Sequence, residues 1–120
     1  MSLFSGKTGL RIGYKELTAA QLAGATTLAT AKLLETLRSA GRLSYIDNST
    51  DKDLWIAFVH PEADPLNTAF RLPAFEIPSD RVLNFSELFP GLYFDPGTYV
   101  YVYSPSGAVT SGKVRLINWG

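Results

Sequence analysis

The stretch GTYVYVYSP, residues 97–105, alternates tyrosine with valine. Successive side chains of a β-strand point to opposite faces, so this pattern predicts a strand with one aliphatic and one aromatic face. We expect Val100 and Val102 to lie in the core. The outer face would then carry three tyrosines: Tyr99, Tyr101 and Tyr103. What those rings contact is the main question about function.

Further short strands are expected throughout residues 42–120. The segment DLWIAFV, residues 53–59, is apolar on both faces, which is typical of a strand buried on both sides or lying beneath an interface. Other candidate strands, separated by proline and polar turn residues, are RLSYID (42–47), TAFRLPAFEIP (68–78), RVLNFSEL (81–88) and KVRLINW (113–119). Six to eight short strands with turns about every ten residues predict an antiparallel β-sandwich or barrel.

The N-terminal third has a different composition, rich in alanine, threonine and leucine. Thr18 and Gln21 have the spacing of a capping box, which predicts a helix start. Three leucines within residues 30–40 share one helical face, and Gly41 is placed to end a helix, so a short helix is expected there. We therefore predict a single globular protein with an N-terminal arm and short helix (1–41) and a β domain (42–120).

The bulk composition argues against several classes of protein. The 120 residues include 11 basic and 11 acidic side chains, and the zero net charge lacks the basic excess of a general nucleic-acid binder. The absence of cysteine excludes disulfides and thiolate metal sites. The beginning of the sequence lacks the apolar run of a signal peptide, and no stretch is long enough to span a bilayer. We expect neither nucleic acid nor membrane as a partner.

Two short motifs suggest ligand sites, but each lacks a necessary part. SGKTG, residues 5–9, resembles the end of a phosphate-binding loop without the earlier glycine that lets backbone amides surround a phosphate. Asp47, Asp51 and Asp53 suggest a calcium loop without its central glycine and closing glutamate. A solvated turn that bonds its own backbone is the favoured interpretation of the three aspartates.

His60 is the single histidine and the best candidate for acid–base chemistry. Its nearest carboxylates in sequence are Glu62 and Asp64, but Pro61 and Pro65 indicate an exposed loop, in which adjacent residues rarely converge on one atom. We expect His60 to be a surface residue. The prediction is a protein that is not an enzyme and uses no cofactor or metal.

Aromatic residues make up 12% of the chain and concentrate after residue 85. Tyrosines on a sheet face can stack on sugars or on single-stranded bases. They can instead anchor a protein interface, or simply form the outer face of a sandwich. Base stacking is the weakest alternative because no lysine or arginine alternates with the tyrosines. The candidate protein-interface residues are Tyr99, Tyr101, Tyr103, Trp55, Phe94 and Trp119.

The order of motifs along residues 43–120 resembles small structural virion proteins of tailed bacteriophages. The resemblance is carried by SYIDNSTDKDLWIAF, then a Leu-Pro strand, then DPGTYVYVYSPSGAVTSGKVRLINWG at the C-terminus. Decoration (cement) proteins of capsids are the nearest kind, followed by head or tail adaptor proteins. The matching turn residues are Asn48, Thr50 and Asp51, the segment 96–103, and Thr110, Ser111 and Gly112. The loop HPEADP (60–65) departs from the pattern, and the N-terminal segment does not align.

The resemblance implies a non-enzymatic β-sandwich or barrel located in the virion and assembled in the host cytoplasm. Such a decoration protein would stabilise the capsid lattice by binding the major capsid protein or other virion subunits. Homo-oligomers are expected because virion positions are symmetric. The alternatives are a head–tail adaptor or tail structural protein, and a carbohydrate-binding module that uses the same tyrosines with Trp55 and Trp119.

Overall fold

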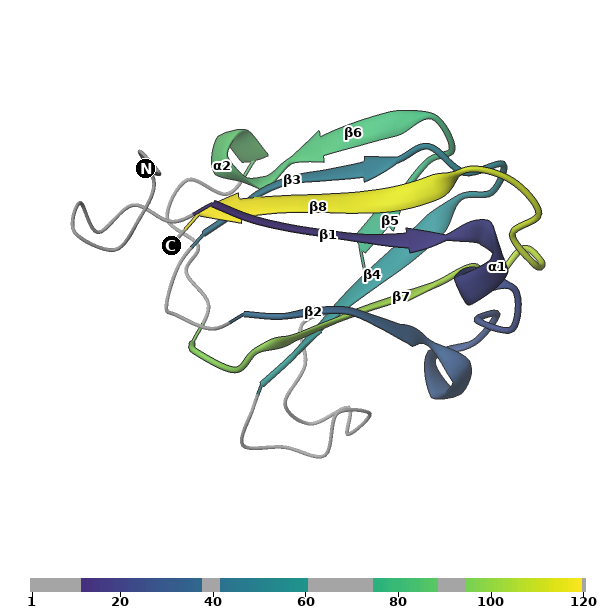
Figure 1. Ribbon diagram of the computed structural model, residues 1–120, viewed down its shortest axis with the longest axis horizontal. Helices are drawn as coiled ribbons and strands as arrows, with labels where there is room; N and C mark the ends of the chain where they lie inside the picture. Colours follow the sequence, from purple (N-terminus) through teal and green to yellow (C-terminus); the bar gives the residue numbers. More distant parts are fainter. Residues whose placement is uncertain (1–11, 38–41, 61–74, 89–94, 120) are drawn as a thin grey trace, which may run out of the picture.

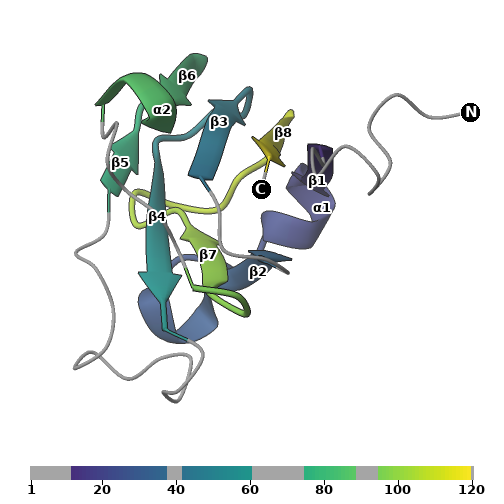
Figure 2. The same ribbon diagram turned by 90° about the vertical axis from the view of Figure 1, so that its left-hand side faces the viewer.

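The computed structural model describes residues 12–37, 42–60, 75–88 and 95–119. Within these residues the chain forms eight strands in two four-stranded antiparallel sheets, which face each other as two layers (Figure 1, Figure 2). The mainly β architecture confirms the antiparallel sandwich of six to eight short strands that the turn spacing predicted.

The first sheet, called sheet A, has the strand order β1-β8-β3-β6. Its strands are β1 (Ile12–Thr18), β3 (Arg42–Asn48), β6 (Arg81–Asn84) and β8 (Lys113–Trp119). The second, sheet B, has the order β2-β7-β4-β5. Its strands are β2 (Lys32–Thr36), β4 (Leu54–Val59), β5 (Phe75–Ile77) and β7 (Tyr99–Tyr103). The two segments with the clearest strand patterns, β4 and β7, are the central strands of sheet B.

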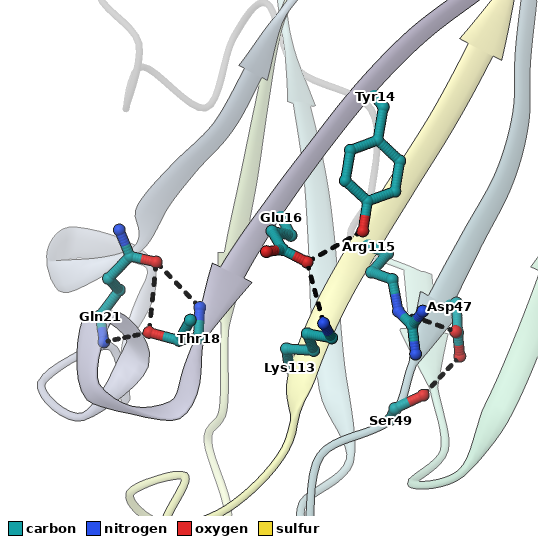
Figure 3. Close-up of polar contacts among 8 residues, drawn as sticks. All are labelled: Tyr14, Glu16, Thr18, Gln21, Asp47, Ser49, Lys113 and Arg115. Atoms are coloured by element: carbon teal, nitrogen blue, oxygen red, sulfur yellow. Dashed lines mark hydrogen bonds and ion pairs between the residues drawn. The ribbon is translucent and has the colours of Figure 1, made fainter.

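Three short helical turns connect the strands of the described residues: α1 (Ala19–Leu22), η2 (Leu28–Thr30) and α2 (Phe85–Leu88). The capping box predicted before α1 is confirmed. The backbone N–H of Thr18 donates to Oε1 of Gln21 at 2.9 Å, and the N–H of Gln21 donates to Oγ1 of Thr18 at 3.4 Å (Figure 3). No helix among the described residues has the length and apolar character needed to span a membrane.

The helix predicted over residues 30–40 is wrong, because this segment forms the edge strand β2 as far as Thr36, and residues 38–40 lie outside the described part. A β-bulge between Leu33 and Glu35 explains the error. The extra residue lets Leu34 and Leu37, three positions apart, both reach the core, which mimics helical spacing. Residues 12–37 thus contribute one strand to each sheet, β1 to sheet A and β2 to sheet B.

The core lies between the inner faces of the two sheets. Val100 and Val102 of β7 are fully buried there, as predicted, opposite Phe58 and Ile56 of β4. Leu116 of β8 is among the fully buried residues of sheet A. Burying each such side chain contributes about 1.5–3 kcal/mol, so the alternating pattern fixes which face of each strand points inward.

Candidate functional site

Two of the turn motifs that carry the resemblance, at residues 48–51 and 110–112, meet at one end of the sandwich. The carboxylate of Asp51, after β3, accepts hydrogen bonds from Oγ1 of Thr110 at 2.5 Å and from the N–H of Thr110 at 3.0 Å, just before β8. A third bond comes from the N–H of Ser111 at 3.2 Å. These bonds, above all the one from the Thr110 hydroxyl, lower the pKa of Asp51 from 3.8 to about 2. The two turns are joined across about sixty residues of sequence.

Asn48 links the two sheets at the same end and is fully buried. Its Nδ2 donates to the carbonyl of Ile77 in β5 at 2.8 Å and to that of Lys52 at 2.9 Å. Its Oδ1 accepts from the hydroxyl of Thr50 at 2.6 Å and from the backbone N–H of Thr50 at 3.0 Å. Both ends of this amide are therefore engaged, and the residue has a structural role.

The three aspartates of the supposed calcium loop serve three different contacts. Asp51 holds the β7–β8 turn, and Asp53 accepts a hydrogen bond from the N–H of Ser79 at 2.9 Å. Asp47 instead lies beside Arg115 of β8. In the described ranges no three histidine or acidic side chains gather closely enough to hold a metal ion. The aspartates thus bond mainly to neighbouring segments, and the bond from this turn to its own backbone is made by Asn48, which accepts from the N–H of Thr50.

His60 follows β4 and lies beside a carboxylate that the sequence did not suggest. Its Nε2 is 3.0 Å from Oδ2 of Asp95, in the segment that leads into β7. The carboxylates expected near it, Glu62 and Asp64, lie outside the described residues, as does the SGKTG motif (5–9). The pair ties the end of one central strand of sheet B to the approach to the other.

The predicted interface residues are partly brought together on the outer face of sheet B. Tyr103 lies directly opposite Trp55 of β4, and opposed residues of antiparallel strands point to the same side. The Tyr99 and Tyr101 rings are 6.1 Å apart between centroids and inclined at 44°. All four side chains are half-buried. We call Tyr99, Tyr101, Tyr103 and Trp55 the tyrosine face.

The tyrosine face is not uniformly open. Ala57 and Val59 of β4 lie opposite Tyr101 and Tyr99 on this same side, yet both are fully buried. On the other flank, Leu33 of β2 lies opposite Tyr101 and is 43% exposed. Accessible apolar surface on this side of the sandwich therefore includes the β2 flank, beside the bulge.

The other two predicted interface residues are not on this face in the described structure. Trp119 belongs to β8 of sheet A, where its backbone pairs with Ile12 and Arg42. Phe94 lies outside the described residues. Trp119 is therefore separated from the tyrosine face, because it belongs to a strand of the opposite sheet.

Sequence reasoning did not select the outer face of sheet A, which carries most of the exposed large hydrophobic side chains of the described residues. Tyr14 of β1 is 51% exposed, Tyr45 of β3 is 37% exposed and Val82 of β6 is 59% exposed. Tyr14 and Tyr45 both lie opposite the half-buried Ile117 of β8, so the three form a row across the sheet. We call Tyr14, Ile117, Tyr45 and Val82 the sheet A face.

A row of charged residues runs beside this aromatic row and is visible in Figure 3. Glu16 accepts a hydrogen bond from the Tyr14 hydroxyl at 2.9 Å, and Nζ of Lys113 lies 3.3 Å from the same oxygen. These two partners, Tyr14 first, lower the pKa of Glu16, while the hydrogen bond to Glu16 raises the pKa of Tyr14. Asp47 accepts from the Ser49 hydroxyl at 2.9 Å and lies 3.4 Å from Nε of Arg115.

A usable signal for the sheet A face was present in the alternation of β3. Ile46 is fully buried, so its neighbour Tyr45 had to point outward. Tyr14 gives no comparable signal, because its segment lacks a clear strand pattern and its partner Ile117 is 103 positions away. Long-range pairing decides which face such a residue joins.

The described residues thus offer two aromatic sheet faces, a structural polar end and one histidine–carboxylate pair. Half-buried rings held by paired strands are suited to contacts with another surface. Comparisons with protein-family models, with curated proteins and with solved structures each found no match.

Proposed function

We propose that this protein is a non-enzymatic structural protein of a tailed-phage virion, most simply a decoration (cement) protein that binds and stabilises the capsid lattice. The observation that carries the proposal is the tyrosine face, with Tyr103 beside Trp55 on the two central strands of sheet B. Tyrosine and tryptophan are enriched where protein surfaces meet, since each ring buries a large area and its polar atom finds a partner.

The placement of these rings favours recognition with little loss of side-chain freedom. Strand β7 is hydrogen-bonded on both sides, to β2 and to β4, and its valines are locked in the core. Half-burial restricts the rings before any partner arrives, so binding would cost less conformational entropy than it would for mobile side chains. The major capsid protein, or another virion subunit, is the proposed partner.

The polar end supports the same proposal in a different way. Asn48, Asp51 and Thr110, which are among the residues behind the virion resemblance, tie turns and sheets together instead of facing a ligand. Strong internal ties suit a small module that must keep its shape while pressed against a lattice. A fold held in this way can stabilise its neighbours by contact alone.

Co-sedimentation with purified phage particles tests the proposal directly. The wild-type protein is expected to sediment with the particles and to stabilise them against heat, and the double variant Tyr101→Ser/Tyr103→Ser is expected to lose both effects. Glu87→Ala, an exposed residue of α2, serves as the control and should behave as wild type. A wild-type protein that is absent from particles and never sediments with them would refute the proposal. Gold labelling then distinguishes the capsid surface from a neck or tail position, where an adaptor or tail protein belongs.

The carbohydrate-binding alternative rests on the same face. Two inclined rings 6.1 Å apart, with a tryptophan on the neighbouring strand, resemble a platform on which sugar rings stack. Titrating tryptophan fluorescence with a panel of glycans tests this alternative, and Trp119→Phe isolates the signal of Trp55. Saturable quenching that disappears in Tyr101→Ala would favour the sugar platform. Fluorescence that does not change with any glycan would count against the sugar platform and leave protein binding as the proposed role of this face.

A further inference from the structure

We infer that the sheet A face is the surface through which two copies of this chain associate. Tyr14, Tyr45 and Val82 are more than a third exposed and share one side of one sheet with Ile117. A single exposed hydrophobic residue needs no explanation, but a set spread over one face of four neighbouring strands is typical of an interaction surface. This inference concerns contacts between copies and does not depend on the proposed virion partner.

The charges on the face favour a second copy as the occupant. Glu16 and Asp47 are balanced there by Lys113 and Arg115, so the surface has no net charge to attract a strongly charged partner. Each of the four is already paired within the chain, which lowers the cost of removing it from water. The whole chain is also neutral, so two copies do not repel each other.

The layout of the two rows complements itself. The aromatic row is Tyr14–Ile117–Tyr45, and the charged row is Glu16–Arg115–Asp47. The two rows are neighbours on the face, two residues apart along each strand. A twofold axis between the rows and parallel to them lays the aromatic row of one copy over the charged row of the second, as an isologous dimer requires. Each tyrosine then faces a carboxylate and Ile117 faces the guanidinium of Arg115, with no like charges opposed.

A second symmetric packing is disfavoured by the same residues. A twofold axis that runs directly over β8 would place Arg115 over Arg115 of the second copy and Glu16 over its Asp47. Like charges directly opposed at an interface are costly. The charged row therefore argues against a dimer axis over β8, whereas the axis between the two rows opposes no like charges.

Edge-to-edge pairing of sheets is also disfavoured. The longest edge strand of the described residues, β1, carries Lys15 opposite Leu116, on the side of the strand that faces the core. A charged residue turned inward on an edge strand discourages pairing with another chain. The edge strand β2 is interrupted by its bulge, and β5 and β6 have three and four residues. Among the described strands, association through a sheet face is therefore favoured over pairing of edges.

Light scattering during size exclusion and sedimentation velocity over a range of concentrations test the inference. The wild-type protein is expected to form dimers. Tyr45→Glu adds a third carboxylate to the face, next to Asp47, and should raise the dimer dissociation constant roughly tenfold or more. Leu33→Glu makes the same kind of change at a similarly exposed position of sheet B and should leave the dimer intact. A wild-type protein that stays monomeric, or a dimer that Leu33→Glu disrupts and Tyr45→Glu does not, overturns the inference.

The absence of cysteine allows a second, independent measurement. Val82→Cys introduces a single thiol on the sheet A face, and Leu33→Cys introduces one on sheet B. A short bismaleimide should cross-link the first variant into dimers at low protein concentration and leave the second monomeric. Equal cross-linking of both variants would contradict the assigned surface. A monomer that binds particles and loses this binding in Tyr45→Glu would assign the face to a virion partner instead, overturning the inference while upholding the proposed function.

Discussion

Gly112 is required by both its backbone conformation and its surroundings. Its φ is +84°, and a Cβ at this position would lie 1.9 Å from the carbonyl oxygen of Ser49. The turn before β8 approaches the β3–β4 turn so closely because Asp51 holds Thr110 and Ser111. A residue that the sequence offers only as part of a turn thus fixes how the two turns pack.

We predict that Gly112→Ala destabilises the fold by about 1–3 kcal/mol or more, since the strained φ and the backbone clash act together. Gly24→Ala is the matched control, because its added Cβ meets no atom within 4 Å. Its effect should stay within about 0.5 kcal/mol. Urea denaturation of both variants measures the difference, and equal midpoints would contradict the close approach.

Asp51 gives the stability of the fold a predictable pH dependence. Its pKa is about 2 when folded against 3.8 ordinarily, so its stabilising effect is fully present above 3.8 and is lost as the pH falls toward 2. Asp51→Asn removes this titration. Thermal unfolding between pH 2 and 7 should show the wild type more stable than the variant at neutral pH, with the two curves converging below pH 4. Curves that stay parallel throughout would show that the carboxylate does not contribute in this way.

At the scale of elements, strands were predictable where the order of apolar residues agrees with their burial. β7 and β4 follow from their sequences because both lie in the middle of sheet B, where neighbours on each side enforce the pattern. β2 did not follow, because its bulge replaces a period of two with a spacing of three between Leu34 and Leu37. Helical periodicity and a bulged edge strand are indistinguishable over so few residues.

The bulge makes a discriminating prediction about adjacent leucines. Leu34→Ala should destabilise the protein by about 2–5 kcal/mol because its side chain is buried in the core. Leu33→Ala should cost less than about 1 kcal/mol because its side chain is 43% exposed. A helix with both leucines on one face would give similar losses. Chemical denaturation of the two variants therefore tests the strand assignment.

For the molecule as a whole, the tyrosine face was predictable, whereas only Tyr45 of the sheet A face had a signal in its own strand. The tyrosine face is built mainly from one contiguous strand, so its sequence alone displays it. The sheet A face joins Tyr14, Tyr45 and Ile117 from three strands that are brought together only by folding. Trp119 is the opposite case: folding places it in β8 of sheet A, away from the candidates on sheet B.

The role of β1 in the sandwich can be tested by truncation. β1 pairs with β8 along all seven of its residues, and Leu17 packs against the core. Deleting residues 1–15 removes half of this strand and should lower the melting temperature by roughly 10 °C or more. Deleting residues 1–11 leaves β1 complete and should have a smaller effect. Thermal unfolding monitored by circular dichroism measures both variants. Equal falls in melting temperature for the two truncations would show that β1 is dispensable.

The burial of Asn48 affects how fast the protein is chemically damaged. Asparagine followed by serine loses its side-chain amide readily in flexible chains, and such residues limit heat resistance. Here the amide is buried and engaged at both ends, so the folded state protects it. Each excursion to the unfolded state exposes it, and conversion to aspartate would return a charge to a dry position between the sheets. Prolonged heating should therefore inactivate the protein irreversibly, with unfolding setting the rate.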